Sequence, residues 1–450
     1  MFDARITADH VSPLAKPKIR ILFYTDFVGF GGADGFSLGI LRDLILGNQP
    51  FFAEFEIDLI NRHSGGHAVN KLTPEVLGRY EQVWFFGLLQ SNMPGEPENE
   101  LVDAEVAALR SWMDAGGGVL ITGDHSNPRP PGADPSLSEY LNLGRALGHR
   151  VPRAGELREW NDRPDASIEF SHNTHTPDPW GSDINNTIPN DLDPYPQELI
   201  LRKRFGRPHA LFQGRRGPIT VFPDHMHEGQ LLIPERFPAD VWPAGRLGQP
   251  KPEIVAHGTD KRNGQVYGVS TVYDGAAAGV GRIVADATWH HYFDINLWGF
   301  EKGGEVLDRL TEYYVNLTLW LTPRLVKLDV NAQLLYWLSR NLSVRAVLPE
   351  GFRVPGITAA GLIREVGGQA VLDDLVWPLE GTPGVPEEVL LGALVKESVA
   401  TLSGGDVEAF DTAGVVERGL RAGAEEYAAE LRAALDDVEG LGELISQGVR

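Results

Sequence analysis

The first 122 residues alternate short apolar runs with amphipathic helical segments, and this alternation constrains the fold more than any other feature of the chain. Uninterrupted apolar runs are typical of strands that are buried on both faces. Strands separated by helices form βαβ units around a parallel sheet. The predicted strands are 18–25, 55–60, 82–88 and 119–122, and the predicted helices are 34–46, 74–80 and 98–115. The sequence therefore predicts an α/β fold with a mainly parallel, doubly wound sheet.

The middle of the chain interrupts this alternation. Residues 126–200 are rich in Pro, Asp and Asn, and a long irregular stretch inside a compact domain usually serves a function. We expect an insertion that loops over the carboxyl edge of the sheet and contains one helix, at 136–147. Further strands are predicted at 210–213, 219–222, 253–257, 266–272 and 282–285, and a helix at 303–321 is expected to close the domain.

A second domain is expected after Pro323. With 450 residues the chain exceeds the roughly 250–300 residues at which a single core usually stops growing. Residues 324–450 are rich in Ala and Glu and carry helical periodicity, so we expect a helical C-terminal domain. Such a domain serves packing or assembly, and a homo-oligomer formed through these helices is one expectation. Residues 1–17 are interpreted as a polar leader.

Composition excludes several classes of partner and chemistry. The net charge of −22 repels a phosphate backbone, so nucleic acid is not an expected partner. The absence of cysteine excludes disulfides, thiolate metal sites and a cysteine nucleophile. No uninterrupted apolar stretch approaches about 18 residues, and the N-terminal residues lack the apolar core of a secretory signal. We therefore expect a cytoplasmic protein with no membrane contact and a small-molecule substrate.

The segment 281–294 carries the strongest functional signal. An apolar run there is typical of a buried strand, and Trp289, His290 and His291 follow it, with Asp294 shortly after. Ligands of open α/β sheets bind outside the carboxyl ends of the strands. We expect His290 to be catalytic and Trp289, His291 and Asp294 to bind substrate, with Asp294 also able to fix a histidine tautomer. The alternative is one buried and one solvated histidine without a catalytic role.

A second cluster, Asp124 and His125, directly follows the predicted strand 119–122. A residue at such a strand-to-turn position projects from the edge of the sheet. We expect both side chains to act as acid–base or ligand groups. The alternative is that Asp124 caps the next turn.

A third cluster is typical of a metal site. If the strand that precedes it continues, His225 and His227 lie on one face, because side chains alternate along a strand. Two imidazoles with a nearby carboxylate are a common beginning of a divalent metal site. We expect Asp224, His225 and His227 to bind Zn, Mn or Fe, and Glu228 to be catalytic.

Two single residues complete the expected site. Asp26, at the end of the strand 18–25, shares the carboxyl edge of the sheet and is expected to bind substrate. His175 lies in the insertion, in a segment that either covers the site as a substrate-binding lid or is a polar surface loop. The Gly-rich turn at 29–35 matches neither the dinucleotide fingerprint nor the P-loop, so no nucleotide is expected.

In order along the chain, four of these pieces resemble the class I glutamine amidotransferase-like superfamily, and within it the trehalose-utilisation (ThuA-like) branch. The four pieces are 19–26, 116–125, 224–228 and 281–290. The resemblance implies that residues 18–323 form a flavodoxin-like doubly wound domain with its site at the carboxyl edge of the sheet. True amidotransferases place a cysteine where this chain has Asp124 and His125, so glutamine hydrolysis through a thioester is excluded.

Two functions remain open at the level of sequence. One is a hydrolase-type enzyme whose His, Asp and Glu side chains act, with or without a divalent metal, on a small polar or carbohydrate-like substrate. The other is a non-catalytic ligand-binding or assembly protein on a degenerate amidotransferase-like scaffold. The first requires that the three clusters meet at one edge of the sheet.

Overall fold

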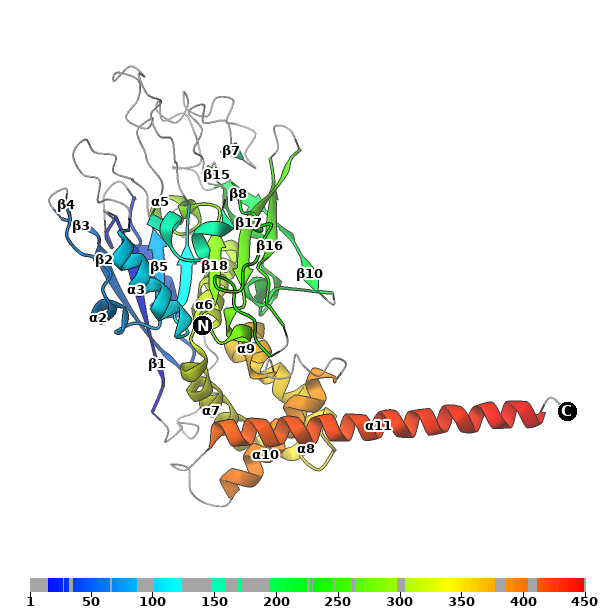
Figure 1. Cartoon of the computed structure of the whole chain (residues 1–450). Coiled ribbons are helices and arrows are strands. Elements are labelled where there is room, and N and C mark those ends of the chain that lie inside the picture. The colour runs from blue at the N-terminus through cyan, green and yellow to red at the C-terminus, as the bar shows by residue number, and fades with distance from the viewer. Residues whose placement is uncertain are drawn as a thin grey trace. The chain divides into compact units, whose positions relative to one another are not determined.

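The computed structural model of the protein describes most of the chain and divides it into two compact units (Figure 1). One unit comprises residues 18–49 and 54–324, and the other comprises 1–17, 50–53 and 325–450. The described residues are 15–26, 28–31, 35–64, 67–86, 101–123, 147–158, 169–170, 195–204, 206–224, 227–228, 230–246, 248–260, 264–297, 304–376, 385–403 and 411–448.

The larger unit is built on an eight-stranded mixed sheet with the order β2-β1-β5-β6-β18-β17-β16-β9. Its strands are β1 (Lys18–Thr25), β2 (Glu54–Asn61), β5 (Gln82–Phe86), β6 (Gly118–Ile121), β9 (Ile200–Leu201), β16 (Glu253–Thr259), β17 (Val266–Tyr273) and β18 (Ile283–Asp286). From β2 to β18 all neighbours are parallel. In chain order these five strands follow the 2-1-3-4-5 arrangement of flavodoxin-like folds, which confirms the predicted fold class. The last three strands add on antiparallel.

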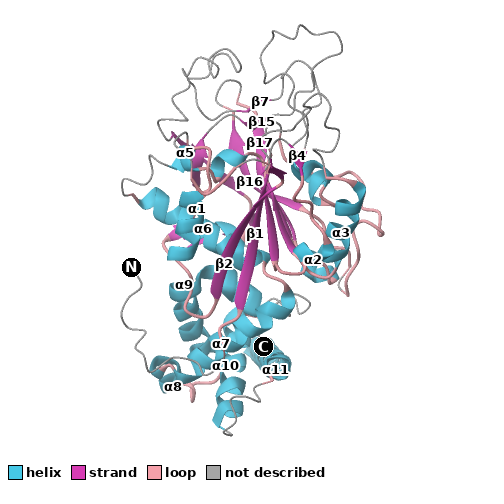
Figure 2. Cartoon of the chain, turned by 90° about the vertical axis from the view of Figure 1, so that its left-hand side faces the viewer, coloured by secondary structure: helices cyan, strands magenta, loops and turns pink. Residues whose placement is uncertain are grey.

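Helices cover both faces of this sheet (Figure 2). One face carries α2 (Pro74–Leu77) and α3 (Asp103–Asp114), and the other carries α1 (Gly39–Gly47), α5 (Asp294–Leu297) and α6 (Glu305–Leu321). The central strands β5 and β6 are buried along their whole length. Burial on both faces explains why these strands read as continuous apolar runs rather than as alternating ones.

Short strand pairs and 3-10 turns lie outside the eight-stranded sheet. Two-stranded pairs are formed by β3 (His63–Ser64) with β4 (His67–Ala68), β8 (Tyr195–Glu198) with β14 (Val221–Asp224), and β7 (Glu169–Phe170) with β15 (His227–Glu228). Two further pairs are β10 (Lys203–Arg204) with β11 (Arg207–Pro208) and β12 (Gln213–Gly214) with β13 (Gly217–Pro218). Turns of 3-10 helix are η3 (Leu147–Arg150), η4 (Ala154–Leu157), η6 (Ala210–Phe212), η7 (Gly275–Ala278) and η8 (Trp289–His291).

Two predicted elements differ from the structure. The predicted strand at 210–213 is mostly the 3-10 turn η6, because the ring of His209 accepts a hydrogen bond from the Leu211 amide and starts a turn there. The helix predicted from residue 34 begins only at Gly39. The helix predicted at 136–147 lies, apart from its last residue, outside the described residues.

The smaller unit is helical, as the sequence predicts for the C-terminal region. Its helices are α7 (Arg324–Arg340), α8 (Leu342–Val347), α9 (Arg353–Val376), α10 (Glu387–Ser403) and α11 (Thr412–Gly448). Helices α9, α10 and α11 pack on one another through buried aliphatic side chains, among them Ile363, Leu391 and Val415. Ion pairs add to this packing, since Arg353 joins Glu388 of α10 to Glu430 of α11, at 2.8 Å in each case.

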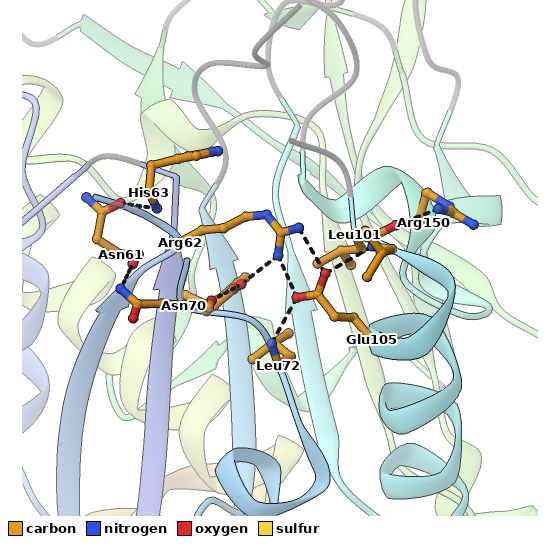
Figure 3. Close-up of polar contacts among 10 residues, drawn as sticks. Asn61, Arg62, His63, Asn70, Leu72, Leu101, Glu105 and Arg150 are labelled. Atoms are coloured by element: carbon orange, nitrogen blue, oxygen red, sulfur yellow. Dashed lines mark hydrogen bonds and ion pairs between the residues drawn. The ribbon is translucent and has the colours of Figure 1, made fainter. Parts of the chain in front are cut away.

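A buried ion pair ties strand β2 to helix α3 near the carboxyl edge of the sheet (Figure 3). The Arg62 guanidinium donates to both oxygens of Glu105, at 2.5 and 2.9 Å, and also to the Tyr24 hydroxyl at 2.9 Å. The backbone amides of Leu72 and Val102 donate to the same carboxylate. Arg62 and Glu105 are 0% and 1% exposed, so both charges depend on these partners for compensation.

The N-terminus of α1 is held by a carboxylate that lies far away in the sequence. Asp294 accepts hydrogen bonds from the amides of Gly39 and Ile40, at 3.1 and 2.8 Å, and from the Ser37 hydroxyl. An acceptor at this position satisfies orphan N–H groups of the first turn and complements the helix dipole. The first turn of α1 contains no acidic residue of its own, which explains why the start of the helix was misplaced by sequence.

Replacing Arg62 by Met is expected to lower the free energy of unfolding by about 3–5 kcal/mol, because it leaves the Glu105 carboxylate buried without its countercharge. The matched control is Arg20→Met, since Arg20 pairs with Glu81 at 2.7 Å but its side chain is 44% exposed. The control is expected to cost no more than about 1 kcal/mol. Urea denaturation measures the loss of stability in both variants. Equal losses would contradict the claim that the buried Arg62–Glu105 pair contributes more than the exposed pair.

Replacing Asp294 by Ala is expected to cost about 3 kcal/mol, because donors at the start of α1 lose their acceptor. Asp43→Ala on the same helix is the control, since the Asp43 side chain is 68% exposed and pairs with its neighbour Arg42. The control is expected to change stability by less than about 1 kcal/mol. Unaltered urea denaturation of the Asp294 variant would show that α1 does not depend on this carboxylate.

The same carboxylate makes the stability of the folded protein depend on pH, in a direction that its pKa shift determines. Burial raises the pKa of Asp294 above its ordinary value of 3.8, although the hydrogen bonds from Ser37, Ile40 and Gly39 oppose the shift. The folded state therefore binds this proton more tightly than the unfolded state, and the associated stability is lost as pH rises through the folded pKa. Asp294→Asn, which does not titrate, should gain stability relative to wild type as the pH rises above about 4. A difference in denaturation midpoint that stays constant as the pH rises would contradict this prediction.

Candidate functional site

The segment that follows β18 forms a buried polar cluster at the carboxyl edge of the sheet. The chain makes the turn η8 there and continues into the short helix α5. Among its polar side chains Asp286 is 0% exposed, His290 2% and His291 1%. Buried polar groups need hydrogen-bond partners, so the contacts of these three residues define what the cluster can do.

Asp286, the last residue of β18, holds His291. The His291 ring donates from Nδ1 to Asp286 Oδ1 at 2.7 Å, because a carboxylate can only accept. Asp286 also accepts from the Tyr292 hydroxyl at 2.8 Å and from the Thr288 amide at 3.2 Å. Burial raises the pKa of Tyr292 well above 10, with the negative charge of Asp286 acting in the same direction, so this hydroxyl remains a donor. The arrangement fixes the His291 tautomer with its proton on Nδ1.

Asn296 of α5 plays the equivalent part for His290. Nδ1 of His290 lies 2.9 Å from Asn296 Oδ1, and the ring stacks on Trp289 with centroids 3.6 Å apart. The His290 amide donates to the Thr288 hydroxyl, which begins η8. Two adjacent imidazoles are therefore each anchored at Nδ1 by a side-chain oxygen.

Two neighbouring strand ends adjoin this cluster. The Trp289 amide donates to the Gly123 carbonyl at 3.0 Å, so the end of β6 meets the turn η8. The buried side chain of Arg158 packs on Gly123, where no Cβ would fit, and donates to the Ala287 carbonyl. On the far side, the ring of Phe222 in β14 lies 4.6 Å from the ring of His291. The strands that lead into the three predicted clusters therefore end beside one another.

The structure describes only some of the remaining predicted site residues. Asp124, His125, His175 and His225 lie outside the described residues. For Asp224, His227 and Glu228 the structure gives the backbone alone, in the strand pairs β14–β8 and β15–β7. Asp26 is 1% exposed at the end of β1, and its carbonyl accepts from the His63 ring at 2.7 Å. Within the described part of the chain, no three His, Asp or Glu side chains form a set able to hold a metal.

Sequence reasoning selected the wrong carboxylate as the partner of the histidines. Asp294 was expected to bind substrate and was also considered able to fix a histidine tautomer, but its described contacts are with the N-terminus of α1. Asp286 takes that role from five residues before His291. Its position as the last residue of the strand was the signal that would have identified it. Asn296 and Arg158 were also missed, and no local pattern marks either of them.

No helix in the described part of the chain combines the length and the apolarity that crossing a membrane requires.

Comparisons with known proteins found likeness only at the level of solved structures. No family model matches the chain, and no curated protein matches it in sequence. A ThuA-like protein of Bacteroides uniformis is 11% identical, with a TM-score of 0.31 over 69% of this chain and 96% of the other. A ThuA-like protein of Parabacteroides merdae is 16% identical, with a TM-score of 0.30 over 68% of this chain and 90% of the other. A cytoplasmic protein of Salmonella typhimurium is 12% identical, with a TM-score of 0.36 over 68% of this chain and 100% of the other.

Proposed function

We propose that the protein is a hydrolase-type enzyme on a ThuA-like scaffold, acting on a small polar or carbohydrate-like substrate at the carboxyl edge of the sheet. The observation that carries this proposal is the pair of anchored imidazoles, with Asp286 on His291 and Asn296 on His290. An imidazole that is held at Nδ1 by a carboxylate or amide oxygen is the usual arrangement of a histidine general base.

In this proposal His290 and His291 move protons through Nε2, while Asp286 and Asn296 keep the tautomers and ring orientations. Asp286 also stabilises positive charge that develops on His291 when its ring accepts a proton. The strand ends at Gly123 and Phe222 adjoin the turn that carries both histidines. This adjacency supports the assignment of Asp124, His125 and Glu228 to the same site as further acid–base groups.

A polar, oxygen-bearing substrate is favoured by two donors in the cluster. The indole Nε1 of Trp289 and the amide Nδ2 of Asn296 are buried and make no hydrogen bond in the described structure. Buried donors are rarely left without an acceptor. A hydroxyl, carbonyl or carboxyl oxygen of a substrate would supply one, which fits a polyol, a lactone or an ester better than an apolar compound.

A divalent metal at this site is a second part of the proposal. Asp224, His225 and His227 are the proposed ligands, and the mixed imidazole and carboxylate set fits Zn, Mn or Fe. A bound metal would supply an activated water at neutral pH.

The alternative is a non-catalytic binding protein, and a specific observation favours it. His290 and His291 are almost fully buried, and Trp289 packs between aromatic rings, with centroids 5.6 Å from Phe36 and 4.5 Å from Phe293. Side chains packed this closely can stabilise the fold without taking part in catalysis. Under this reading, assembly through the C-terminal helices becomes the main activity, supported by the exposed Leu431 and Leu435 on α11.

The test is an activity screen of the full chain on sugars, glycosides, lactones and esters, followed by Asp286→Asn. The variant leaves a similar volume but removes the negative charge that stabilises a protonated His291, so the turnover rate is expected to fall by roughly 10²- to 10⁴-fold. Tyr80→Phe, which removes a hydroxyl bonded to Asp58 at 2.9 Å, is the control and should retain full activity. A screen without turnover, or an Asp286 variant as active as wild type, would favour the non-catalytic alternative.

Metal content gives an independent test of the proposed divalent metal site. The purified chain is expected to carry close to one Zn, Mn or Fe per molecule, and a variant with His225→Ala and His227→Ala is expected to lose it. The control His257→Ala removes a histidine from β16, outside the proposed ligand set. Metal retained by the double variant would overturn the ligand assignment, whereas a metal-free wild type would leave only the acid–base mechanism.

A further inference from the structure

Arg153 occupies a strained backbone position in the core of the larger unit. Among the described residues other than glycine, it alone has a positive φ, with φ 63° and ψ −50°. The Ala154 amide donates to the Pro152 carbonyl at 2.6 Å across it, which closes a γ-turn of the rare, strained form. Strain of this kind persists where the surroundings require one side chain in one place, and it concentrates at binding sites.

The guanidinium that this turn positions is only partly bonded. Arg153 is 3% exposed, and its Nη1 donates to Asp114 Oδ1 at 2.7 Å and to the Val241 carbonyl at 3.3 Å. Its Nε and Nη2 are buried and have no hydrogen-bond partner in the described structure. These two nitrogens form one edge of the guanidinium fork, with parallel N–H bonds that match a single anion or the two oxygens of a carboxylate.

Two more buried donors lie in the same part of the core. Trp242 follows Val241, and its ring meets the ring of Tyr273 edge-on at 4.9 Å. The indole Nε1 and the Tyr273 hydroxyl both lack a hydrogen-bond partner in the described structure, and both residues are 0% exposed. Burial raises the pKa of Tyr273 to about 12, and the positive charge of Arg153 is near enough to oppose this rise. The hydroxyl therefore stays protonated at neutral pH and can donate.

The chemistry of these groups selects the ligand. Arg Nε, Arg Nη2 and Trp Nε1 can only donate, whereas one water has two lone pairs and must also place its own protons. An anion accepts from all of them. The carboxylates already present limit the charge of the ligand, because Asp114 pairs with Arg153 at Nη1 and Asp274 also acts on Tyr273. Their repulsion disfavours a doubly charged anion more than a singly charged one.

We propose that Arg153, Trp242 and Tyr273 form a binding site for a small monovalent anion, either chloride or a carboxylate. Tyr273 is paired with Ile283, the first residue of β18, so the site lies at the amino edge of the parallel strands. It is therefore separate from the candidate site at the carboxyl edge and does not depend on the proposed function. The anion would join η4, the loop before β16 and the end of β17.

The test measures thermal unfolding of the full chain as sodium chloride or sodium acetate replaces a bulky organic sulfonate at constant ionic strength. A ligand that binds only the folded state raises the midpoint with the logarithm of its concentration. The wild type is expected to gain several degrees with at least one of the two anions. A gain with chloride alone or acetate alone identifies the source, and a flat response to both overturns the proposal.

Two variants assign the effect to the site. Arg153→Gly removes the guanidinium, and glycine tolerates the positive φ, so this variant is expected to fold and to lose the anion response. Tyr273→Phe removes one hydroxyl and should weaken the response several-fold, whereas the control Tyr80→Phe should respond as wild type does. An undiminished response in Arg153→Gly would overturn the proposal. A bromide-soaked crystal adds a direct readout, since an anomalous peak beside Nε and Nη2 of Arg153 is expected and its absence would contradict the site.

Discussion

One buried carboxylate, Asp286, organises the candidate site. It accepts three hydrogen bonds, from His291, Tyr292 and Thr288, and the Tyr292 hydroxyl lies 3.3 Å from that of Tyr313 in α6. A buried carboxylate is costly unless donors compensate it. These donors come from the turn after β18, so the charge and the turn stabilise each other. The orientation of both imidazoles, and hence any chemistry at this edge, depends on that mutual arrangement.

The frame of the fold was predictable because its signals are local. Strand β1 has the bounds that its apolar run indicates, and β5, β6, β17 and β18 lie within a few residues of their predictions. Buried strands flanked by helices leave a pattern that can be read within one window of sequence. The start of α1 was not predictable, because its capping group is Asp294, 255 residues from Gly39. The antiparallel direction of the last three strands was not predicted either, since strand direction leaves no local pattern.

The position of the site was predictable from the sequence, but the hydrogen-bond partners of its histidines were not. His290 and His291 follow a strand end, and the topology alone places strand ends at one edge of the sheet. Their partners are decided by the 3-10 turn η8, which folds the His291 ring back onto Asp286 and brings His290 onto Asn296. Arg158 lies 129 residues from the carbonyl of Ala287 that it binds. Such contacts depend on tertiary packing, which spacing along the chain does not encode.

The tautomers of the two histidines show directly whether Asp286 and Asn296 anchor their rings at Nδ1. Two-bond ¹⁵N–¹H correlation spectra of the histidine-labelled protein report which ring nitrogen carries the proton, and His290→Gln and His291→Gln assign the signals. We expect a proton on Nδ1 of both rings near neutral pH, and we expect that of His291 to be no longer fixed at Nδ1 in Asp286→Ala, which removes its acceptor. A proton on Nε2 and a bare Nδ1 in the wild type would show that these two side chains do not fix the histidine tautomers.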